Sequence, residues 1–278
     1  MSLETKPLAV NLFTVRRELI ADFEGTLARL AEIGFSGVEP MIFGPVPLEA
    51  LPEDLRVPTP PAAEFRRQLD ALGLQTASLH APLPEGTLAD WVLDFAEALG
   101  TDQLILSSWL ALPGAGQAHT DAALIPAVAE RFDVACELAA SRGIRVGFHN
   151  HHFEWEHDLG GQSAWDRFWE AVDPRVVAEV DVYWAQTAGR DPATEIAALG
   201  ERVRRVHLKD GPARLGEPQL ALGAGGVDIE ACVLAATHAE WHIVELDECA
   251  GDMFDALVAS RRFLLERGLT PDGASSPP

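Results

Sequence analysis

The stretch Arg145–Glu156, which reads RVGFHNHHFEWE, has the residue types and spacing of a functional site. It begins with alternating apolar residues, as a buried strand does. It then places imidazoles and carboxylates within eight residues, at His149, His151, His152, Glu154 and Glu156. Such side chains pack poorly in a core but bind metal ions and move protons, so the cluster indicates a metal or proton-transfer site. The alternatives are a solvated loop and an HNH-type nuclease, whose small finger-like fold the flanking sequence does not indicate.

The composition limits the class of protein. The chain has 278 residues, 47% of them apolar and 23% charged, which suffices for a large core and fits one barrel domain. A net charge of −22 disfavours nucleic acid as a partner, because its phosphates would meet a repulsive field. Three scattered cysteines fit a reducing compartment. We expect no signal peptide and no membrane span, and therefore a cytoplasmic protein.

Eight strand-like segments alternate with helical segments along the chain. The predicted strands are Leu8–Val15, Gly37–Met41, Leu74–Ala81, Gln103–Trp109, Ile144–His149, Val176–Tyr183, Arg205–Lys209 and Trp241–Leu246. The predicted helices are Arg16–Gly34, Ala62–Leu72, Leu88–Leu99, Ala122–Arg142, Trp165–Val172, Pro192–Glu201, Ile229–Thr237 and Met253–Arg267. A Pro-rich loop, Phe43–Pro61, is a candidate lid.

This alternation predicts an α/β fold, a parallel (β/α)₈ TIM barrel that forms a single domain over residues 1–269. Residues 270–278, which read TPDGASSPP, have the composition of a disordered tail. A doubly wound open sheet is the alternative. It is disfavoured because no glycine-rich nucleotide-binding turn follows an early strand.

In such a barrel the reacting groups lie at the C-terminal ends of the strands. Six of the eight predicted strands end in a residue that binds metals or moves protons. These residues are Glu39, His80, His149 with His151, Asp181, His207 and Glu245. Each of them alone could be a core histidine or a rim carboxylate. Their occurrence at equivalent positions favours one shared site.

Four of these residues would come from four consecutive strands and can converge: His149, Asp181, His207 and Glu245. Two imidazole nitrogens and two carboxylate oxygens suit Mn²⁺, Co²⁺, Zn²⁺ or Fe²⁺ and leave room for a bidentate substrate. The outer groups or proton handlers would be Glu39, His80, Glu154 and Lys209. Three tryptophans could stack on a sugar ring or pack in the core, namely Trp109, Trp155 and Trp184.

Several segments together resemble one family. They are NLFTVR, LAEIGFSGVEP, SLHAP, GFHNHHFEWE, EVDVYWAQTAGRDP, VHLKDGP, GAGGVDI and IVELDE. From about Leu8 to about Leu269 the chain resembles the xylose isomerase-like TIM-barrel superfamily, and most closely its sugar phosphate isomerase/epimerase branch. The resemblance implies a divalent metal at the barrel mouth. Its ligands would be His149, Asp181, His207 and Glu245, with Glu39, His80 and Lys209 as outer groups.

The chain departs from one branch of this superfamily. Ketose 3-epimerases use two metal-bound glutamates, on strands five and eight, to move a proton between the two faces of a cis-enediolate. Here His149 stands at the strand-five position, and Trp184 stands where those enzymes often have histidine. Inosose dehydratase and keto-sugar eliminating relatives keep a His-rich strand five and an HLKD strand seven, as this chain does. The resemblance therefore leaves epimerisation and elimination both open.

The leading prediction is a metal-dependent sugar isomerase or epimerase that removes a proton next to a carbonyl and passes through an enediolate. The catalytic candidates are Glu245, His151, Glu154 and Lys209, and the substrate-binding candidates are Glu39, His80, Trp109 and Trp184. The alternatives are a keto-sugar or cyclitol dehydratase or lyase on the same metal, and a non-catalytic sugar-binding barrel. Phosphodiester cleavage, known for the apurinic endonuclease branch, is disfavoured by the acidic charge.

The expected partner is a small sugar or cyclitol, and neither nucleic acid nor a membrane. The sequence shows no dense cluster of Arg and Lys, which favours an unphosphorylated substrate. Assembly into a homo-oligomer stays open.

Overall fold

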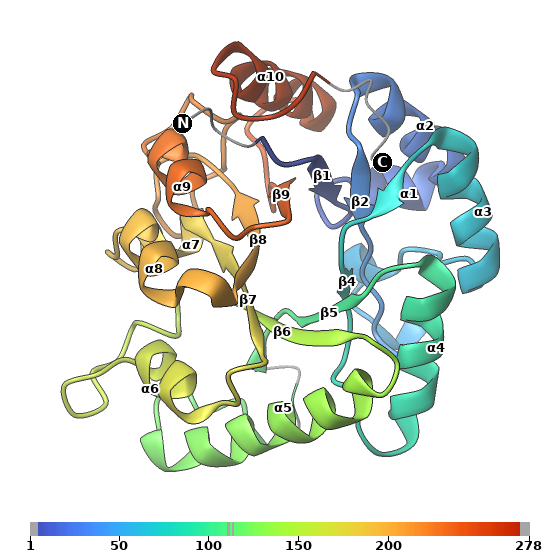
Figure 1. Cartoon of the computed structure of the whole chain (residues 1–278). Helices are drawn as coiled ribbons and strands as arrows, with labels where there is room; N and C mark the ends of the chain where they lie inside the picture. Colours follow the sequence, from blue (N-terminus) through green and yellow to red (C-terminus); the bar gives the residue numbers. More distant parts are fainter. Residues whose placement is uncertain (1–4, 110–111, 113, 273–278) are drawn as a thin grey trace.

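The structure is a computed structural model that describes residues 5–109, 112 and 114–272. Its strands are β1 (Leu8–Asn11), β2 (Gly37–Glu39), β3 (Gln75–Thr76), β4 (Leu79–His80), β5 (Gln103–Leu106), β6 (Arg145–His149), β7 (Val177–Asp181), β8 (Val203–Leu208) and β9 (Trp241–Val244). They pair in the order β3-β2-β1-β9-β8-β7-β6-β5-β4, and every pairing is parallel. Figure 1 shows the strands around the centre of the molecule and the helices outside them, so the predicted TIM barrel is confirmed.

The helices that surround the strands alternate with them along the chain. They are α1 (Arg16–Ala21), α2 (Phe23–Ile33), α3 (Ala62–Leu72), α4 (Ala89–Leu99), α5 (Ile125–Ala140), α6 (Ala164–Ala171), α7 (Val182–Thr187), α8 (Pro192–Leu199), α9 (Ile229–Ala235) and α10 (Met253–Glu266). The candidate lid Phe43–Pro61 contains two short 3₁₀ turns, Leu48–Ala50 and Glu53–Leu55. Its role as a lid stays a prediction.

The ninth strand arises because the predicted strand Leu74–Ala81 is split into β3 and β4. The chain at β2 pairs first with β3 and then, just beyond β2, with β4. Ala77 N donates to Val38 O at 2.9 Å, and His80 N donates to Pro40 O at 2.9 Å. Met41 then forms a parallel bridge with His80. This bridge places β4 beside the end of β2 and brings the two edges of the sheet together.

Two aspartates change the predicted elements, and both do so by capping helices. The predicted helix Arg16–Gly34 is wrong as a single helix, because Asp22 adopts an extended backbone with φ of −155° and accepts a hydrogen bond from Gly25 N. Asp22 therefore ends α1 and begins α2. The predicted strand Val176–Tyr183 is too long, because Asp181 accepts from Trp184 N and begins α7. Both aspartates offer a carboxylate to an otherwise unpaired helical N–H.

The barrel interior is apolar at mid-height. Ala9, Ala77 and Ile243 form a small cluster there. Ala9 and Ile243 are partners across β1 and β9. Because strand side chains alternate between faces, Asn11 and Glu245, two residues further along each strand, share this interior face. The next interior layer towards the strand ends is polar, and it underlies the candidate site.

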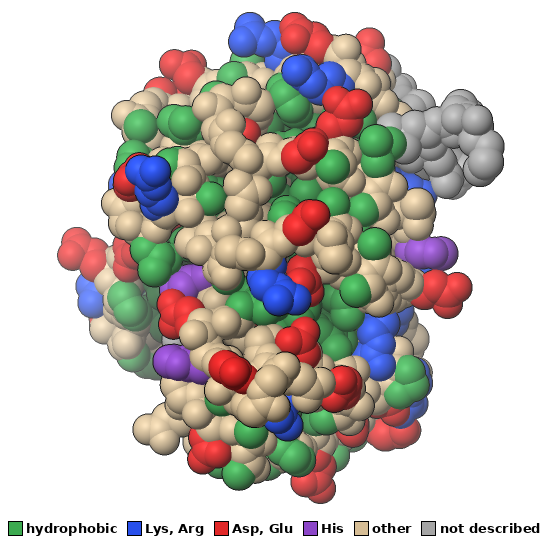
Figure 2. All heavy atoms as spheres, turned by 90° about the vertical axis from the view of Figure 1, so that its left-hand side faces the viewer, with side chains coloured by type: hydrophobic (Ala, Val, Ile, Leu, Met, Phe, Trp, Pro, Cys, Tyr) green, Lys and Arg blue, Asp and Glu red, His purple; other side chains and the backbone are tan. Residues whose placement is uncertain are grey.

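The surface, the helices and the end of the described chain bear on three predictions from the sequence. On the face in Figure 2, basic side chains are interspersed with acidic ones and do not gather into one patch. Among the described helices none combines the length and the apolar character that a bilayer crossing requires. Thr270, at the start of the predicted tail, is buried, and its hydroxyl donates to Lys6 O at 3.4 Å. The tail residues 273–278 lie outside the described residues.

Candidate metal centre at the barrel mouth

The ends of four consecutive strands bring the four predicted metal ligands together. His149 is the last residue of β6, Asp181 the last of β7, His207 lies in β8, and Glu245 directly follows β9. One ligand atom from each residue lies within 4.8 Å of the others. All four side chains are at most 5% exposed. The convergence expected from the strand ends is therefore present in the structure.

This donor set fits a divalent ion. Two imidazole nitrogens and two carboxylate oxygens are the ligands that Mn²⁺, Co²⁺, Zn²⁺ and Fe²⁺ bind, and two carboxylates neutralise a double positive charge. Asn150, which is fully buried and is not one of the four candidate ligands, fixes the position of Asp181. Asn150 Nδ2 donates to Asp181 O at 3.1 Å, and Asn150 Oδ1 accepts from Asp181 N at 2.9 Å. This pair of bonds ties the end of β6 to the end of β7.

Each candidate ligand histidine has one ring nitrogen towards the mouth and one into the barrel. His207 Nδ1 lies 2.6 Å from Glu245 Oε2, while its Nε2 lies 2.7 Å from Glu39 Oε2. His149 Nε2 lies 3.9 Å from Asp181 Oδ2, while its Nδ1 lies 3.1 Å from Glu179 Oε1. The mouth-facing atoms of the set are therefore His149 Nε2 and His207 Nδ1.

The two imidazoles differ in charge when no ion is bound. Burial lowers the pKa of His149 to about 3, so this ring is neutral and has a free lone pair. Burial also lowers the pKa of His207, but the carboxylates of Glu179, Glu39 and Glu245 outweigh it and raise the pKa well above its usual value. Metal binding at His207 Nδ1 would therefore release a proton.

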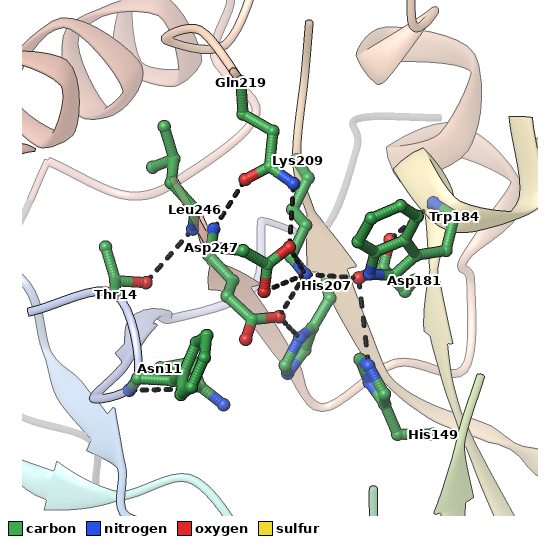
Figure 3. A network of polar contacts seen from close by, with 12 residues as sticks. Asn11, Thr14, His149, Asp181, Trp184, His207, Lys209, Gln219, Leu246 and Asp247 are labelled. Atoms are coloured by element: carbon green, nitrogen blue, oxygen red, sulfur yellow. Dashed lines mark hydrogen bonds and ion pairs between the residues drawn. The ribbon is translucent and has the colours of Figure 1, made fainter. Parts of the chain in front are cut away.

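Lys209 lies between two of the candidate ligands. Its Nζ is 2.9 Å from Asp181 Oδ2, 2.8 Å from Glu245 Oε2 and 3.0 Å from Asp247 Oδ2 (Figure 3). Burial lowers the pKa of Lys209, but these three carboxylates together raise it well above its usual value. The ammonium is therefore charged, and it can donate hydrogen bonds to a developing anion but cannot serve as a base.

Asp247, which the sequence analysis did not single out, is itself positioned by Gln219. Asp247 N donates to Gln219 Oε1 at 2.6 Å, and Gln219 Nε2 donates back to Asp247 Oδ2 at 2.8 Å (Figure 3). The two residues are 28 positions apart in the chain. No local pattern signals this pairing, although Asp247 belongs to the IVELDE segment that resembles the family.

A buried polar layer lies beneath the four candidate ligands. Glu39 accepts from Asn11 Nδ2 at 2.6 Å and from Ser78 Oγ at 2.5 Å, in addition to its contact with His207. Across the barrel His80 Nε2 lies 2.6 Å from Glu179 Oε1. Glu39 and His80, which we predicted to contact substrate, are 0% and 4% exposed and contact the histidines and carboxylates of this layer.

Glu179 is a residue of the site that the sequence analysis missed. It lies in the middle of β7, is fully buried, and shares the interior face with Asp181 because the two are two residues apart. A charged residue inside the apolar strand VAEVD was a usable signal. Burial raises the pKa of Glu179, but His207 and His80 outweigh it and hold the pKa well below its usual value. Its carboxylate is therefore ionised.

His151 and Glu154 follow β6 and border the four candidate ligands. His151 contacts His149 edge-on at 5.2 Å between ring centroids and stacks on Phe153. Burial, His149 and Lys209 lower the pKa of His151 well below its usual value, and within the part of the chain that the structure describes its Nδ1 has no hydrogen-bond partner. Glu154 Oε2 accepts from His151 N at 2.9 Å, and burial raises the pKa of Glu154 to about 8. At neutral pH His151 can accept a proton and Glu154 can donate one.

The tryptophans separate into one beside the site and two away from it. Trp184 lies 5.4 Å from Lys209 Nζ and 5.2 Å from the His152 ring. Trp109 is 1% exposed and stacks on Phe148. Phe148 precedes His149 in β6, so its side chain points to the outer face of the sheet, whereas His149 points into the barrel. Trp155 packs on Trp165 at 4.7 Å. The structure therefore brings Trp184 to the site and leaves Trp109 and Trp155 in the packing between sheet and helices.

Similarity to known proteins covers most of the chain. A family model described as xylose isomerase-like TIM barrel matches residues 27–247. A sugar phosphate isomerase/epimerase from Parabacteroides distasonis has a similar structure, with 20% identity, 96% of each chain covered and a TM-score of 0.71. No curated protein matches the sequence significantly.

Two further solved structures are similar. The probable 3-DHS dehydratase involved in petrobactin synthesis from Bacillus anthracis shares 16% identity, covers 94% of this chain and 99% of its own, and gives a TM-score of 0.66. An L-ribulose 3-epimerase shares 13% identity over 96% of this chain and 95% of its own, with a TM-score of 0.64. At these identities the structures show a common fold. The family model, which spans most of the chain, shows more: this protein belongs to the xylose isomerase-like TIM barrel family.

Proposed function

We propose that the protein is a divalent-metal-dependent sugar isomerase or epimerase that removes a proton next to a carbonyl through an enediolate. The observation that carries this proposal is the set of two imidazoles and two carboxylates within 4.8 Å at the barrel mouth. His149, Asp181, His207 and Glu245 would hold the ion. When bound, the ion would polarise a carbonyl and make an adjacent hydroxyl more acidic.

The neighbouring side chains supply the proton transfers. His151 is neutral, and its Nδ1 has no hydrogen-bond partner among the described residues, so it is a candidate base for the α-proton, although the lowered pKa makes its ring a weaker base. The Lys209 ammonium would donate a hydrogen bond to the substrate oxygen that gains negative charge. Trp184 would offer a flat apolar face to the sugar ring. Glu245 stays a candidate base, although its contacts with His207 and Lys209 hold its carboxylate in the ligand set.

The comparisons support a sugar as the substrate class. Similar structures carry the names sugar phosphate isomerase/epimerase and L-ribulose 3-epimerase, and the family is named after xylose isomerase. The net charge of −22 is consistent with a small, uncharged substrate and not with nucleic acid. We also propose that the protein works in the cytoplasm, on the basis of its sparse cysteines.

A dehydratase or eliminating lyase on the same metal is the second candidate. Glu154 favours it, because burial raises the pKa of this carboxyl to about 8 and its Oε1 finds no hydrogen-bond partner in residues 5–109, 112 and 114–272. A protonated carboxyl beside the base could protonate a leaving group at the β-carbon. One of the similar structures is named a probable 3-DHS dehydratase.

Hydrogen–deuterium exchange in D₂O tests the proposal. Protein reconstituted with Mn²⁺ or Co²⁺ would be incubated with a panel of ketoses and 3-keto-sugars and followed by NMR. We expect deuterium to enter the α-position, and the product identifies isomerisation or elimination. His207→Ala and Glu245→Ala should lose the exchange by about 10³-fold, as expected when several kcal/mol of charge stabilisation is removed.

The matched control is Glu240→Gln. Glu240 lies beyond the opposite end of the barrel, where its carboxylate pairs with Arg145 and Arg205. This variant should exchange like the wild type. Binding of a panel sugar to the metal-loaded protein without any exchange would contradict the enzyme proposal and support a non-catalytic sugar-binding barrel.

A further inference from the structure

We propose that Glu179 is a positioning residue: its carboxylate fixes His149 with Nδ1 protonated and Nε2 free to bind the ion at the mouth. This inference rests on the metal centre of the proposed function. It assigns a role to a residue inside the barrel that would touch neither the ion nor the substrate.

The contacts of Glu179 support this role. His149 and Glu179 are direct partners across β6 and β7, so their side chains stand next to each other on the interior face. Glu179 Oε1 lies 3.1 Å from His149 Nδ1, 2.6 Å from His80 Nε2 and 3.1 Å from His207 Nε2. His80 therefore anchors the carboxylate from the other side. Glu179 is 0% exposed, so water does not compete for these contacts.

The chemistry of imidazole makes this contact decisive. A neutral imidazole carries one N–H and one lone pair, and an ionised carboxylate can only accept hydrogen bonds. The nitrogen that faces Glu179 must therefore be the protonated one. Nε2, which faces Asp181, keeps the lone pair that a metal requires. Hydrogen bonding of the far nitrogen to a carboxylate also fixes the ring and makes the ligand more basic.

Glu39 faces His207 in the corresponding way. Its Oε2 lies 2.7 Å from His207 Nε2, and the other ring nitrogen faces Glu245. His207 is thus backed by both Glu39 and Glu179, whereas His149 is backed by Glu179. Glu179 is the sharper test, because Asp181 Oδ2 lies 3.9 Å from His149 Nε2, and no other described carboxylate at the mouth lies within hydrogen-bond distance to fix the ring instead.

The same residues could alternatively enclose an ion deeper in the barrel. His80, His149, Glu179 and His207 also lie within 4.8 Å of one another. This deep set and the mouth set share both His149 and His207. It offers one carboxylate where the mouth set offers two, so it neutralises a divalent ion less well. The favoured arrangement is therefore an ion bound by the mouth set, with the deep set holding protons only.

Titration of metal-free protein with Co²⁺, followed by its visible absorption, distinguishes the two arrangements. Asp181 belongs only to the mouth set, and Glu179 only to the deep set. We expect Asp181→Asn to abolish Co²⁺ binding, and Glu179→Gln to weaken it by 10- to 100-fold, which is about the effect of losing such an outer contact. Glu240→Gln should bind Co²⁺ like the wild type. Circular dichroism of each variant checks that it folds.

The converse result overturns the inference. If Glu179→Gln abolishes binding while Asp181→Asn retains it, the ion binds in the deep set and Glu179 is a ligand. An unchanged dissociation constant in Glu179→Gln would show that the contact does not position His149.

A second readout needs no metal. ¹⁵N NMR of histidine-labelled protein reports which ring nitrogen carries the proton, and a His149→Gln spectrum assigns the signal. We expect His149 to be the Nδ1–H tautomer in the wild type and a mixture in Glu179→Gln. An Nε2–H tautomer in the wild type contradicts the inference. Neither readout uses a sugar, so failed deuterium exchange with intact Co²⁺ binding would contradict the proposed function alone.

Discussion

Buried charges occur at both ends of the barrel interior, but they are balanced in different ways. At the start of the strands Arg205 is 2% exposed, and its guanidinium donates to Ala77 O, Arg204 O and Glu240 Oε2. Arg145 donates to both oxygens of the same glutamate at 2.7 Å. Two guanidinium groups therefore surround one carboxylate, and both oxygens of Glu240 accept hydrogen bonds from them.

At the mouth the balance is reversed. One ammonium, Lys209, faces the three carboxylates of Asp181, Glu245 and Asp247. A surplus of buried acceptors is costly unless a further cation shares them. The difference teaches that buried charge alone does not indicate a functional site. The end with satisfied donors stabilises the fold, and the end with surplus acceptors is suited to bind a cation.

Lys209→Met should give the largest contrast between the two ends. Loss of the ammonium leaves buried carboxylates unpaired, so the free energy of unfolding of the metal-free protein should fall by about 3–5 kcal/mol. Metal affinity should instead rise by about tenfold, because a positive charge beside the ion is removed. Urea unfolding with and without Mn²⁺ measures both effects.

Arg205→Met is the matched control for this prediction. It should destabilise the protein by a similar amount, since Arg205 is also a buried cation with a carboxylate partner. Its Mn²⁺ affinity should equal that of the wild type. If Mn²⁺ stabilises Lys209→Met no more than Arg205→Met, Lys209 and the ion do not share the same carboxylates.

Asn150→Ala should have a smaller effect, located at the mouth. It leaves Asp181 N and Asp181 O without their side-chain partners, which costs about 1–3 kcal/mol per buried group. The end of β7 should then lose its fixed position. We expect weaker Co²⁺ binding as well as a lower free energy of unfolding, both measured on the same sample. Loss of stability with unchanged Co²⁺ affinity would mean that Asn150 supports the fold alone.

The two ends of the barrel should also differ in the sign of their pH dependence. Burial raises the pKa of Glu154 at the mouth from 4.5 to about 8. A raised pKa favours the folded state at low pH, so this contribution declines as pH rises from 4.5 to about 8. At the other end burial raises the pKa of Glu240, but Arg145 and Arg205 outweigh it and lower the pKa to about 2. That contribution is present above pH 4.5 and is lost as pH falls towards 2.

Glu154→Gln and Glu240→Gln separate these contributions in urea unfolding between pH 3 and 9. Glu154→Gln should remove the decline of stability between pH 4.5 and 8. Glu240→Gln should cost about 1 kcal/mol at pH 7, since its carboxylate is partly exposed, and less at pH 3. Parallel stability curves for both variants would contradict the assignment of the two environments.

The sequence predicted the barrel, because alternating strands and helices with glycines at helix ends leave few other folds. It also predicted His149, Asp181, His207 and Glu245, because the ends of consecutive parallel strands must meet. It did not predict Glu179, which lies within a strand and whose partner His80 is 99 positions away. Nor could it show which ring nitrogen of His149 faces the mouth, since that depends on side-chain rotation in the folded barrel.

The position of the ion is the central claim, and an anomalous difference map from crystals grown with Mn²⁺ tests it most directly. We predict one peak at the mouth, about 2.0–2.2 Å from oxygens of Asp181 and Glu245 and from His149 Nε2 and His207 Nδ1. A peak between His80 and Glu179, or none in crystals saturated with Mn²⁺, would contradict the account.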